Sequence, residues 1–263
     1  MHSGTGFMHM AVRELFELRD RKAVVTGAGG GIGRELCIAL AEMGADVALV
    51  DINRENMEKV AQELRKYGGK TLVCATDVIK EKEVEGMVST VLSKFSSIDI
   101  LVNCAGIPHW APAEGMKQED WDRVIDVNLK GTFLCCKAVG RSMIAQRAGK
   151  IINIASMSAR IVNHPQPQVG YNASKAGVVM LTKSLAAEWG KYNINVNSIS
   201  PGYIATELTK KVSEYHEQWM RLTPMQRMGD PSELKGSIIY LASEASRYVT
   251  GHDLVVDGGY TLW

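Results

Sequence analysis

The chain has 263 residues, of which 46% are hydrophobic and 22% are charged, and its formal net charge is +1. This length and apolar content are enough for one large core and would allow one or two domains. The balanced charge, with no basic stripe or acidic tail, argues against a nucleic-acid-binding protein. The longest apolar runs are far shorter than the ~20 residues that span a bilayer, so no membrane segment is predicted.

The amino terminus lacks the features of a secretory signal peptide. It contains Arg13 but neither a sustained apolar core nor a small-residue cleavage pattern. We expect residues 1–19 to form a partly mobile extension and residues 20–263 to form a single domain. The cysteines are odd in number, lie in apolar stretches and show no metal-ligand spacing: Cys37, Cys74, Cys104, Cys135 and Cys136. They predict reduced core residues of a cytoplasmic protein without a metal site.

Apolar, strand-like runs alternate with helical patterns along the chain. The predicted strands cover residues 23–26, 47–50, 71–76, 98–103, 150–155, 193–199 and 254–256. The predicted helices cover residues 34–44, 54–67, 81–95, 118–147 and 177–192, and Asp230-Pro231 supplies the start of a late helix through Leu241. This alternation predicts an α/β protein with a doubly wound Rossmann fold, in which helices cover both faces of a mainly parallel, seven-stranded sheet.

A glycine-rich loop joins the first predicted strand to the first helix. The run Lys22 to Thr26 leads into Gly27-Ala28-Gly29-Gly30-Gly31-Ile32-Gly33, and a helical pattern follows. Bare backbone amides at a helix N-terminus bind phosphate, and glycines allow the close approach. The strict dinucleotide fingerprint fails because Ile32 occupies its sixth position, and no Walker-type Gly-Lys-Ser/Thr follows. The loop therefore predicts a dinucleotide site and argues against a nucleoside triphosphatase.

An acidic residue, Asp51, ends the second predicted strand, about 20 residues after the glycine loop. A carboxylate there accepts hydrogen bonds from a ribose diol and would repel a 2′-phosphate. Arg54 is the only cation nearby in the sequence, so we predict NAD rather than NADP. The alternative is that Asp51 caps the helix that begins near Arg54.

Other strand ends should meet at the same edge of the sheet, where doubly wound folds bind ligands. Asp77-Val78 is placed to hold an adenine, and the small residues of the Asn103 to Gly106 segment leave room for a cofactor. Ser156 follows the fifth strand and Pro201-Gly202 follows the sixth.

A potential proton donor lies in the run Tyr171-Asn172-Ala173-Ser174-Lys175. A helix would place Tyr171 and Lys175 one turn apart on the same face. A free phenol titrates near pH ~10, and a neighbouring ammonium favours its ionised form, which would allow proton exchange with an alcohol oxygen. Ser156 is the candidate partner and Ser158 is its rival. The alternative is a packed tyrosine beside a solvated lysine.

Five motifs in order resemble the short-chain dehydrogenase/reductase family. They are Thr26-Gly27-x-x-x-Gly31-x-Gly33, Asn103-Cys104-Ala105-Gly106 (with Cys104 in place of a second asparagine), Asn128, the set Ser156, Tyr171 and Lys175, and Pro201-Gly202. The resemblance implies that Asn128, Ser156, Tyr171 and Lys175 are catalytic, with Asn128 holding a water and Lys175 binding the nicotinamide ribose. It implies NAD contacts from Gly27, Gly31, Ile32, Gly33, Asp51, Asp77, Val78, Asn103, Ala105, Gly106, Tyr171, Lys175, Pro201, Gly202, Ile204 and Thr206. It also implies a homotetramer.

Three segments should flank the nicotinamide: residues 107–114, residues 159–168 and a substrate lid at residues 203–222. The candidates for substrate contacts are four residues of these segments and the two serines after the fifth strand: His109, Gln168, Tyr203, Trp219, Ser156 and Ser158. The long loop before Tyr171 and the closing Val-Asp-Gly-Gly-Tyr260 resemble the polyol branch of the family, which oxidises sugar alcohols to ketoses. A reductase of 3-oxoacyl chains on acyl carrier protein, or of other carbonyls, is the alternative enzyme. A non-catalytic dinucleotide sensor or scaffold is the alternative outside catalysis.

Overall fold

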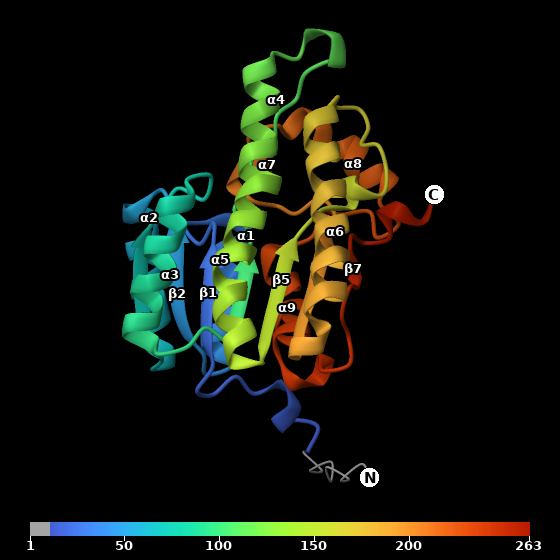
Figure 1. The fold of residues 1–263 in the computed structure, drawn as a ribbon. Coiled ribbons are helices and arrows are strands. Elements are labelled where there is room, and N and C mark those ends of the chain that lie inside the picture. The colour runs from blue at the N-terminus through green and yellow to red at the C-terminus, as the bar shows by residue number, and fades with distance from the viewer. Residues whose placement is uncertain (1–10) are drawn as a thin grey trace, which may run out of the picture.

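The computed structural model describes residues 11–263, and its centre is a sheet of seven parallel strands with helices on both faces (Figure 1). The strand order is β3-β2-β1-β4-β5-β6-β7, and all neighbouring pairs are parallel. The predicted Rossmann fold is therefore confirmed, and the sheet is parallel throughout. The strands are β1 (Lys22–Thr26), β2 (Asp46–Asp51), β3 (Thr71–Ala75), β4 (Ile100–Asn103), β5 (Gly149–Ile154), β6 (Ile194–Pro201) and β7 (Asp253–Val256).

Two hydrophobic layers hold the helices against the sheet. One layer packs α1 (Gly31–Glu42), α2 (Arg54–Leu64) and α9 (Lys235–Ala242) against one face. The other packs α3 (Glu81–Phe95), α5 (Gly131–Gln146) and α6 (Val169–Trp189) against the opposite face. Because both faces are covered, the central strands are apolar without a break, as in β1, where Ala23, Val24 and Val25 are all fully buried.

Helix ends are where prediction and structure differ most. The helix predicted over residues 118–147 is two helices, α4 (Gln118–Ile125) and α5, joined by a π-helical turn at Asp126–Lys130. The helix predicted from residue 177 begins eight residues earlier, at Val169. The late helix starts as a 3₁₀ turn, Pro231–Leu234, which Asp230 caps as predicted, and continues as α9. The lid contains two short helices that were not predicted, α7 (Glu207–Lys210) and α8 (His216–Leu222).

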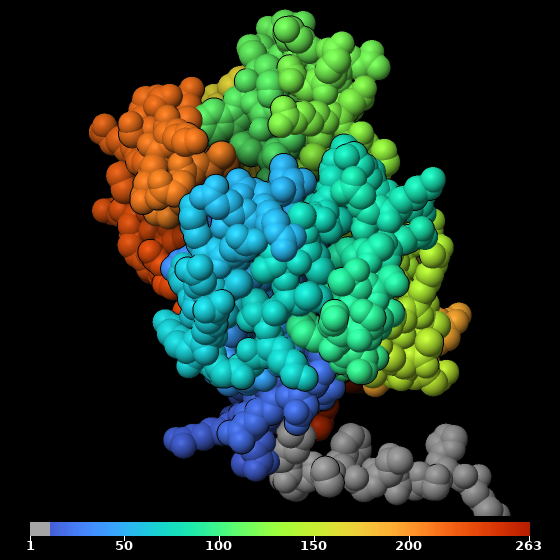
Figure 2. Space-filling model, turned by 90° about the vertical axis from the view of Figure 1, so that its left-hand side faces the viewer, coloured from blue at the N-terminus to red at the C-terminus, as the bar shows by residue number. Residues whose placement is uncertain are grey.

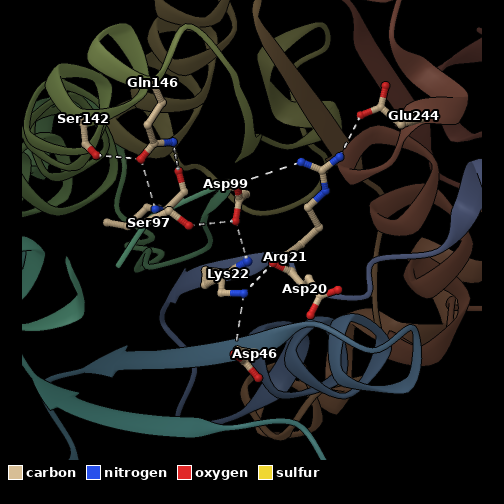
Figure 3. A network of polar contacts seen from close by, with 10 residues as sticks. Asp20, Arg21, Lys22, Asp46, Ser97, Asp99, Ser142, Gln146 and Glu244 are labelled. Carbon is tan, nitrogen blue, oxygen red and sulfur yellow. Dashed lines mark hydrogen bonds and ion pairs between the residues drawn. The ribbon is translucent and has the colours of Figure 1, made fainter. Parts of the chain in front are cut away.

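A polar network closes the amino ends of the central strands (Figure 3). Asp99 accepts a hydrogen bond from the backbone N–H of Lys22 at 2.8 Å, which joins the entry of β4 to the start of β1. Arg21 lies between Asp99 and Glu244, with its guanidinium 3.2 Å from the Glu244 carboxylate. Gln146 at the end of α5 bonds the backbone of Ile98 on both its N–H and its C=O. These contacts fix the end of the sheet that faces away from the ligand edge.

Part of the predicted amino-terminal extension packs on the domain. Residues 1–10 lie outside the described residues, but Leu18 is fully buried and its backbone N–H bonds to Met43 O at 2.9 Å. Within residues 11–263, no helix combines the length and the apolar character needed to cross a membrane.

A buried carboxylate on β7 joins three parts of the fold. Asp253 accepts hydrogen bonds from the hydroxyls of Ser198 and Ser200, both at 2.7 Å, and from Arg160 Nε at 2.8 Å. Arg160 belongs to one of the segments predicted to flank the substrate. Its guanidinium instead anchors that segment to the sheet.

Replacing Asp253 by Ala should lower the free energy of unfolding by about 3 kcal/mol, because two buried hydroxyls and one guanidinium lose their acceptor. Urea titration followed by circular dichroism measures this change. The control is Glu207→Ala, which removes an exposed carboxylate paired with Lys210 and should change stability by less than about 0.5 kcal/mol. An Asp253→Ala variant as stable as that control would contradict the assignment.

Candidate active site

Two cavities adjoin at the carboxyl edge of the sheet. The first has a volume of about 540 Å³ and is lined by the glycine loop and by residues that follow β2 to β6. The second has a volume of about 480 Å³ and lies under the lid. Ser156 and Tyr171 belong to the wall that the two cavities share. Figure 1 shows α4 and the lid beyond the carboxyl edge of the sheet, and Figure 2 shows the green and orange segments to which they belong at the same end of the molecule.

The glycine loop is built for close backbone approach. Gly27 has a φ of +67°, and a Cβ added there would lie 2.8 Å from the backbone of Ala105. A Cβ on Gly33 would lie 2.0 Å from the carbonyl oxygen of Gly27. Helix α1 begins at Gly31, three residues earlier than predicted, and its first residues line the cavity without a side-chain cap. The first turn therefore presents bare amides to a ligand, as an anion such as a pyrophosphate requires.

Asp51 lies at the carboxyl end of β2, on the rim of the first cavity. Its carboxylate accepts hydrogen bonds from the backbone N–H of Gly29 at 3.0 Å and from that of Asn53 at 2.9 Å. Asn53, not Asp51, caps α2, because its side chain accepts from Asn56 N. The alternative role for Asp51 as the cap is therefore wrong.

The arginines that follow Asp51 and the glycine loop most closely in the sequence have carboxylate partners. Arg54 bonds to Glu58 at 3.0 Å. Arg34, in the first turn of α1, bonds to both Glu35 and Glu63. The rim of the first cavity beside Asp51 is therefore negative in character.

Lys175 and Asn128 make buried hydrogen bonds beside the wall that the two cavities share. The Lys175 ammonium is buried, donates to the carbonyl of Ile154 at 2.8 Å and lies 5.7 Å from the centroid of the Tyr171 ring. Asn128, in the π-helical turn, bonds both backbone groups of Ile107 at 2.8 and 3.0 Å and donates to Ser174 Oγ at 3.0 Å. Its side chain thus ties the loop after β4 to helix α6 beside Tyr171.

Burial governs the pKa values of this pair. It lowers the pKa of Lys175 to about 8, because the ammonium has lost its water. It raises the pKa of the Tyr171 phenol above its ordinary value, and the neighbouring Ser156 side chain acts in the opposite direction. This direction differs from the prediction that Lys175 lowers the pKa of Tyr171, because desolvation of the phenolate is the largest influence on that pKa in this structure.

Aromatic side chains form one wall of the second cavity. Trp219 of α8 is buried and stacks on Tyr203, with ring centroids 4.1 Å apart and planes 7° apart. Trp110 meets the edge of Trp219 at 6.2 Å, and Tyr260 meets Tyr203 at 5.3 Å. His109, at the same cavity, lies 3.6 Å from the Asp120 carboxylate. The lid thus contains one stacked pair of rings, and rings from two other segments meet this pair edge-on.

Most of the predicted site residues gather at these cavities. Of the predicted cofactor set, all but Asn103 and Ile204 line the first cavity, and Ile204 lines the second. Asn103 lines neither. Its side chain lies in the protein interior and donates to Asn153 Oδ1 at 2.9 Å, so the structure does not place this side chain at the cofactor cavity. The six substrate candidates all line the second cavity.

Sequence reasoning did not single out several lining residues. Ile52, Asn56, Thr76 and Arg123 line the first cavity. Asn163 and Gln166, by contrast, belong to the predicted flanking segment of residues 159–168; they line the second cavity and are buried. Ile52 directly follows Asp51 and is 75% exposed, which is unusual for an isoleucine. Packing of its side chain against a flat adenine ring would explain this exposure.

The first cavity fits a nicotinamide dinucleotide. It offers bare amides for the pyrophosphate, a carboxylate for a ribose diol, and glycines at positions where a Cβ would collide with backbone. Within residues 11–263 no cluster of three or more His, Cys, Asp or Glu side chains could hold a metal ion.

Comparison with known proteins assigns the family. A family model described as "Enoyl-(Acyl carrier protein) reductase" matches residues 27–261. The crystal structure of a short-chain type dehydrogenase/reductase from Mycobacterium marinum is 44% identical, has a TM-score of 0.93, and the match covers 95% of this chain and 99% of that one. This chain therefore belongs to the short-chain dehydrogenase/reductase family, and it is a nicotinamide-dinucleotide-dependent oxidoreductase that acts on CH–OH groups.

Curated relatives of nearly full length are dehydrogenases of polyols. A galactitol 2-dehydrogenase (L-tagatose-forming) of Cereibacter sphaeroides is 42% identical over 97% of this chain and 100% of its own length. An NADP-dependent mannitol dehydrogenase of Hypocrea jecorina is 45% identical over 94% and 95%. An NAD-dependent glycerol dehydrogenase of Listeria innocua is 41% identical over 94% and 96%. The relatives thus share a substrate class but differ in the dinucleotide that they use.

Proposed function

We propose that this protein oxidises a secondary alcohol of a polyol or sugar alcohol to the corresponding ketose with NAD⁺, and that the reaction runs reversibly. The observation that carries the proposal is the position of Tyr171 and Ser156 in the wall that the two cavities share. A group in that wall reaches a substrate on one side and a dinucleotide on the other. The hydride can therefore leave the carbinol carbon for the dinucleotide in the same step in which the proton leaves the attached oxygen for Tyr171.

Each member of the catalytic set has a distinct task in this proposal. Tyr171 takes the hydroxyl proton of the substrate, and Ser156 donates a hydrogen bond to the same oxygen. Lys175 binds the nicotinamide ribose and supports the charge of the phenolate. Asn128 holds a water that continues the proton path and keeps the loop after β4 beside α6. The bound dinucleotide supplies the hydride acceptor at its nicotinamide ring.

The lining of the second cavity favours a polyhydroxylated substrate. The buried amides of Asn163 and Gln166 line it beside the stacked rings of Tyr203 and Trp219, to which they are hydrogen-bonded. Amides pair with hydroxyl groups, and ring faces pack against the C–H bonds of a sugar chain. A purely apolar pocket would lack the first of these two contacts.

NAD preference follows from the charge at the rim of the first cavity. Asp51 would bind the two ribose hydroxyls, whereas a 2′-phosphate would meet its negative charge, and the arginines Arg34 and Arg54 are each paired with carboxylates. The remaining contacts of the dinucleotide would come from the glycine loop and from Asp77, Val78 and Thr206.

A substrate panel tests the proposal directly. Galactitol, D-arabinitol, mannitol, xylitol, sorbitol, glycerol and gluconate are offered with NAD⁺ and with NADP⁺ at alkaline pH, and reduced dinucleotide is measured by absorbance. We expect at least one open-chain polyol to exceed simple secondary alcohols in kcat/KM by about 10²-fold, as several additional hydrogen bonds would give. Turnover of simple alcohols alone would contradict the polyol assignment.

The same panel includes the alternative enzyme. A 3-oxoacyl thioester is added with NADH and with NADPH, because the alternative enzyme would reduce the 3-oxo group of acyl chains on acyl carrier protein. A rate with this thioester above that of every ketose would favour the alternative.

Assembly and location are part of the same proposal. Phe133 of α5 and Met180 of α6 expose large apolar side chains, by 43% and 61%. We therefore propose a homotetramer that buries these helices, which light scattering tests. We further propose a cytoplasmic location, in keeping with five cysteines that are all free.

A further inference from the structure

The innermost wall of the second cavity is a chain of buried hydrogen-bonding side chains that ends at Ser156. Gln168 Nε2 lies 3.2 Å from Ser158 Oγ, and Ser158 Oγ lies 3.0 Å from Ser156 Oγ. Gln168 and Ser158 are 6% and 4% exposed. Both were predicted to bind substrate directly, but their present partners are protein atoms.

The hydrogen count of the Gln168 amide shows how fully it is used. Its two hydrogens serve three acceptors: Ser158 Oγ, Asn163 Oδ1 at 2.8 Å and Asn172 Oδ1 at 2.8 Å. Its oxygen accepts from Gln166 Nε2 at 3.4 Å. An amide in this position can act on the reaction through Ser158 without leaving its protein partners.

The direction of the bond between the two serines decides what Ser156 can do. In this structure Ser156 donates to Ser158 Oγ, and Ser158 N donates to Ser156 Oγ at 3.1 Å. With that direction, the only hydroxyl hydrogen of Ser156 is committed to Ser158. An alcohol oxygen that becomes negative as it loses its proton needs that hydrogen.

We propose that Gln168 and Ser158 are positioning residues that turn the Ser156 hydroxyl toward the reacting oxygen. Gln168 donates to Ser158, Ser158 then donates to Ser156, and Ser156 is left to donate to the substrate. The change is a rotation of two hydroxyl groups, with no covalent bond made or broken. Each donor polarises the next in such a chain, which strengthens the last bond. The inference rests on the proposed function, because it needs a substrate oxygen at Ser156.

The competing interpretation is that Ser158 and Gln168 bind a second hydroxyl of the substrate. The two interpretations differ in kinetics. A chain that acts through Ser156 changes kcat and loses its effect once Ser156 is gone. A separate substrate contact raises KM and keeps its effect when Ser156 is replaced.

The test is a double-mutant cycle on the best polyol of the panel. Ser158→Ala should lower kcat about tenfold, less than the ~10²-fold or greater loss typical of removing a direct donor, with KM little changed. In a Ser156→Ala background the same substitution should cost less than about twofold. Gln168→Met should lower kcat in the wild-type background and have no further effect beside Ser158→Ala. Additive losses, or a loss confined to KM, would overturn the proposal.

Controls separate this outcome from misfolding and from failure of the proposed function. Ser246→Ala removes another buried serine hydroxyl, one that bonds only backbone carbonyls far from the site, and should leave kcat unchanged. Tm and the Kd of the dinucleotide are measured for every variant. If Ser158→Ala does not fold, Ser158→Cys keeps the volume and replaces the hydroxyl by a weak donor. A wild type that turns over no polyol removes both proposals, whereas an active wild type with an additive cycle removes only this one.

Discussion

Replacing Tyr171 by Phe should lower kcat about 10³-fold while the protein still folds and binds dinucleotide. The phenol lies in the wall shared by the two cavities, and the substitution removes only its hydroxyl. Loss of a positioned acid–base group typically costs roughly 10²- to 10⁴-fold, and about 10³-fold is the middle of that range. Steady-state kinetics with the best polyol measures the change, and fluorescence titration with NADH measures binding.

The matched control for this substitution is Tyr192→Phe, at the far end of the same helical segment. Its ring packs beside Lys191, well away from both cavities. It should retain wild-type kcat. Normal turnover by Tyr171→Phe would contradict the assigned mechanism.

The pKa of Tyr171 also predicts opposite pH profiles for the two directions. Burial raises this pKa, so the phenolate that accepts a proton becomes abundant only at alkaline pH. Alcohol oxidation should therefore rise as pH increases, whereas ketone reduction uses the protonated phenol and should hold through neutral pH and fall at alkaline pH. Measuring kcat/KM in both directions from about pH 6 to about pH 10 tests this. Identical profiles would argue against the phenol as the titrating group.

Replacing Asp51 by Asn should raise the ratio of kcat/KM for NADP⁺ to kcat/KM for NAD⁺ by about 10²-fold. The change removes one negative charge at the rim where a 2′-phosphate would lie, and like charges in contact cost several kcal/mol. Each tenfold change in the ratio corresponds to about 1.4 kcal/mol. Asparagine keeps an acceptor for the backbone N–H of Gly29 or Asn53, so the loop should hold its shape.

A control for this charge lies on the same strand. Asp46→Asn removes a carboxylate at the opposite end of β2, where it bonds Lys70 N, and should leave the cofactor ratio unchanged. An unchanged ratio in Asp51→Asn would show that other groups select the dinucleotide.

Much of the fold could be predicted because local sequence and tertiary structure agree. The fully buried strands read as apolar runs, and helix α3 has the predicted bounds, residues 81–95. The glycine loop and Asp51 were found because close approach and charge restrict those positions to few residue types.

Other features depend on contacts that sequence periodicity cannot show. The π-helical turn at Asp126–Lys130 keeps a continuous helical pattern although it re-aims Asn128 toward Ile107. Helix α6 begins at Val169 in a stretch containing Gly170 and Asn172, which are poor helix formers, so packing outweighs propensity there. The bond from Trp219 to Gln166, at 3.1 Å, joins positions 53 residues apart and has no local signature.

The polar network of Asp99, Arg21 and Glu244 lies at the opposite end of the strands from every proposed ligand contact (Figure 3). These three side chains are thus spatially separated from the side chains that meet the substrate in the proposed mechanism. Changes in the loops at the carboxyl edge can alter selectivity without loosening the frame, and the amino end can be reinforced without affecting turnover. Because of this separation, substrate selectivity can evolve at the carboxyl edge of the sheet, and stability can be engineered separately at the amino end.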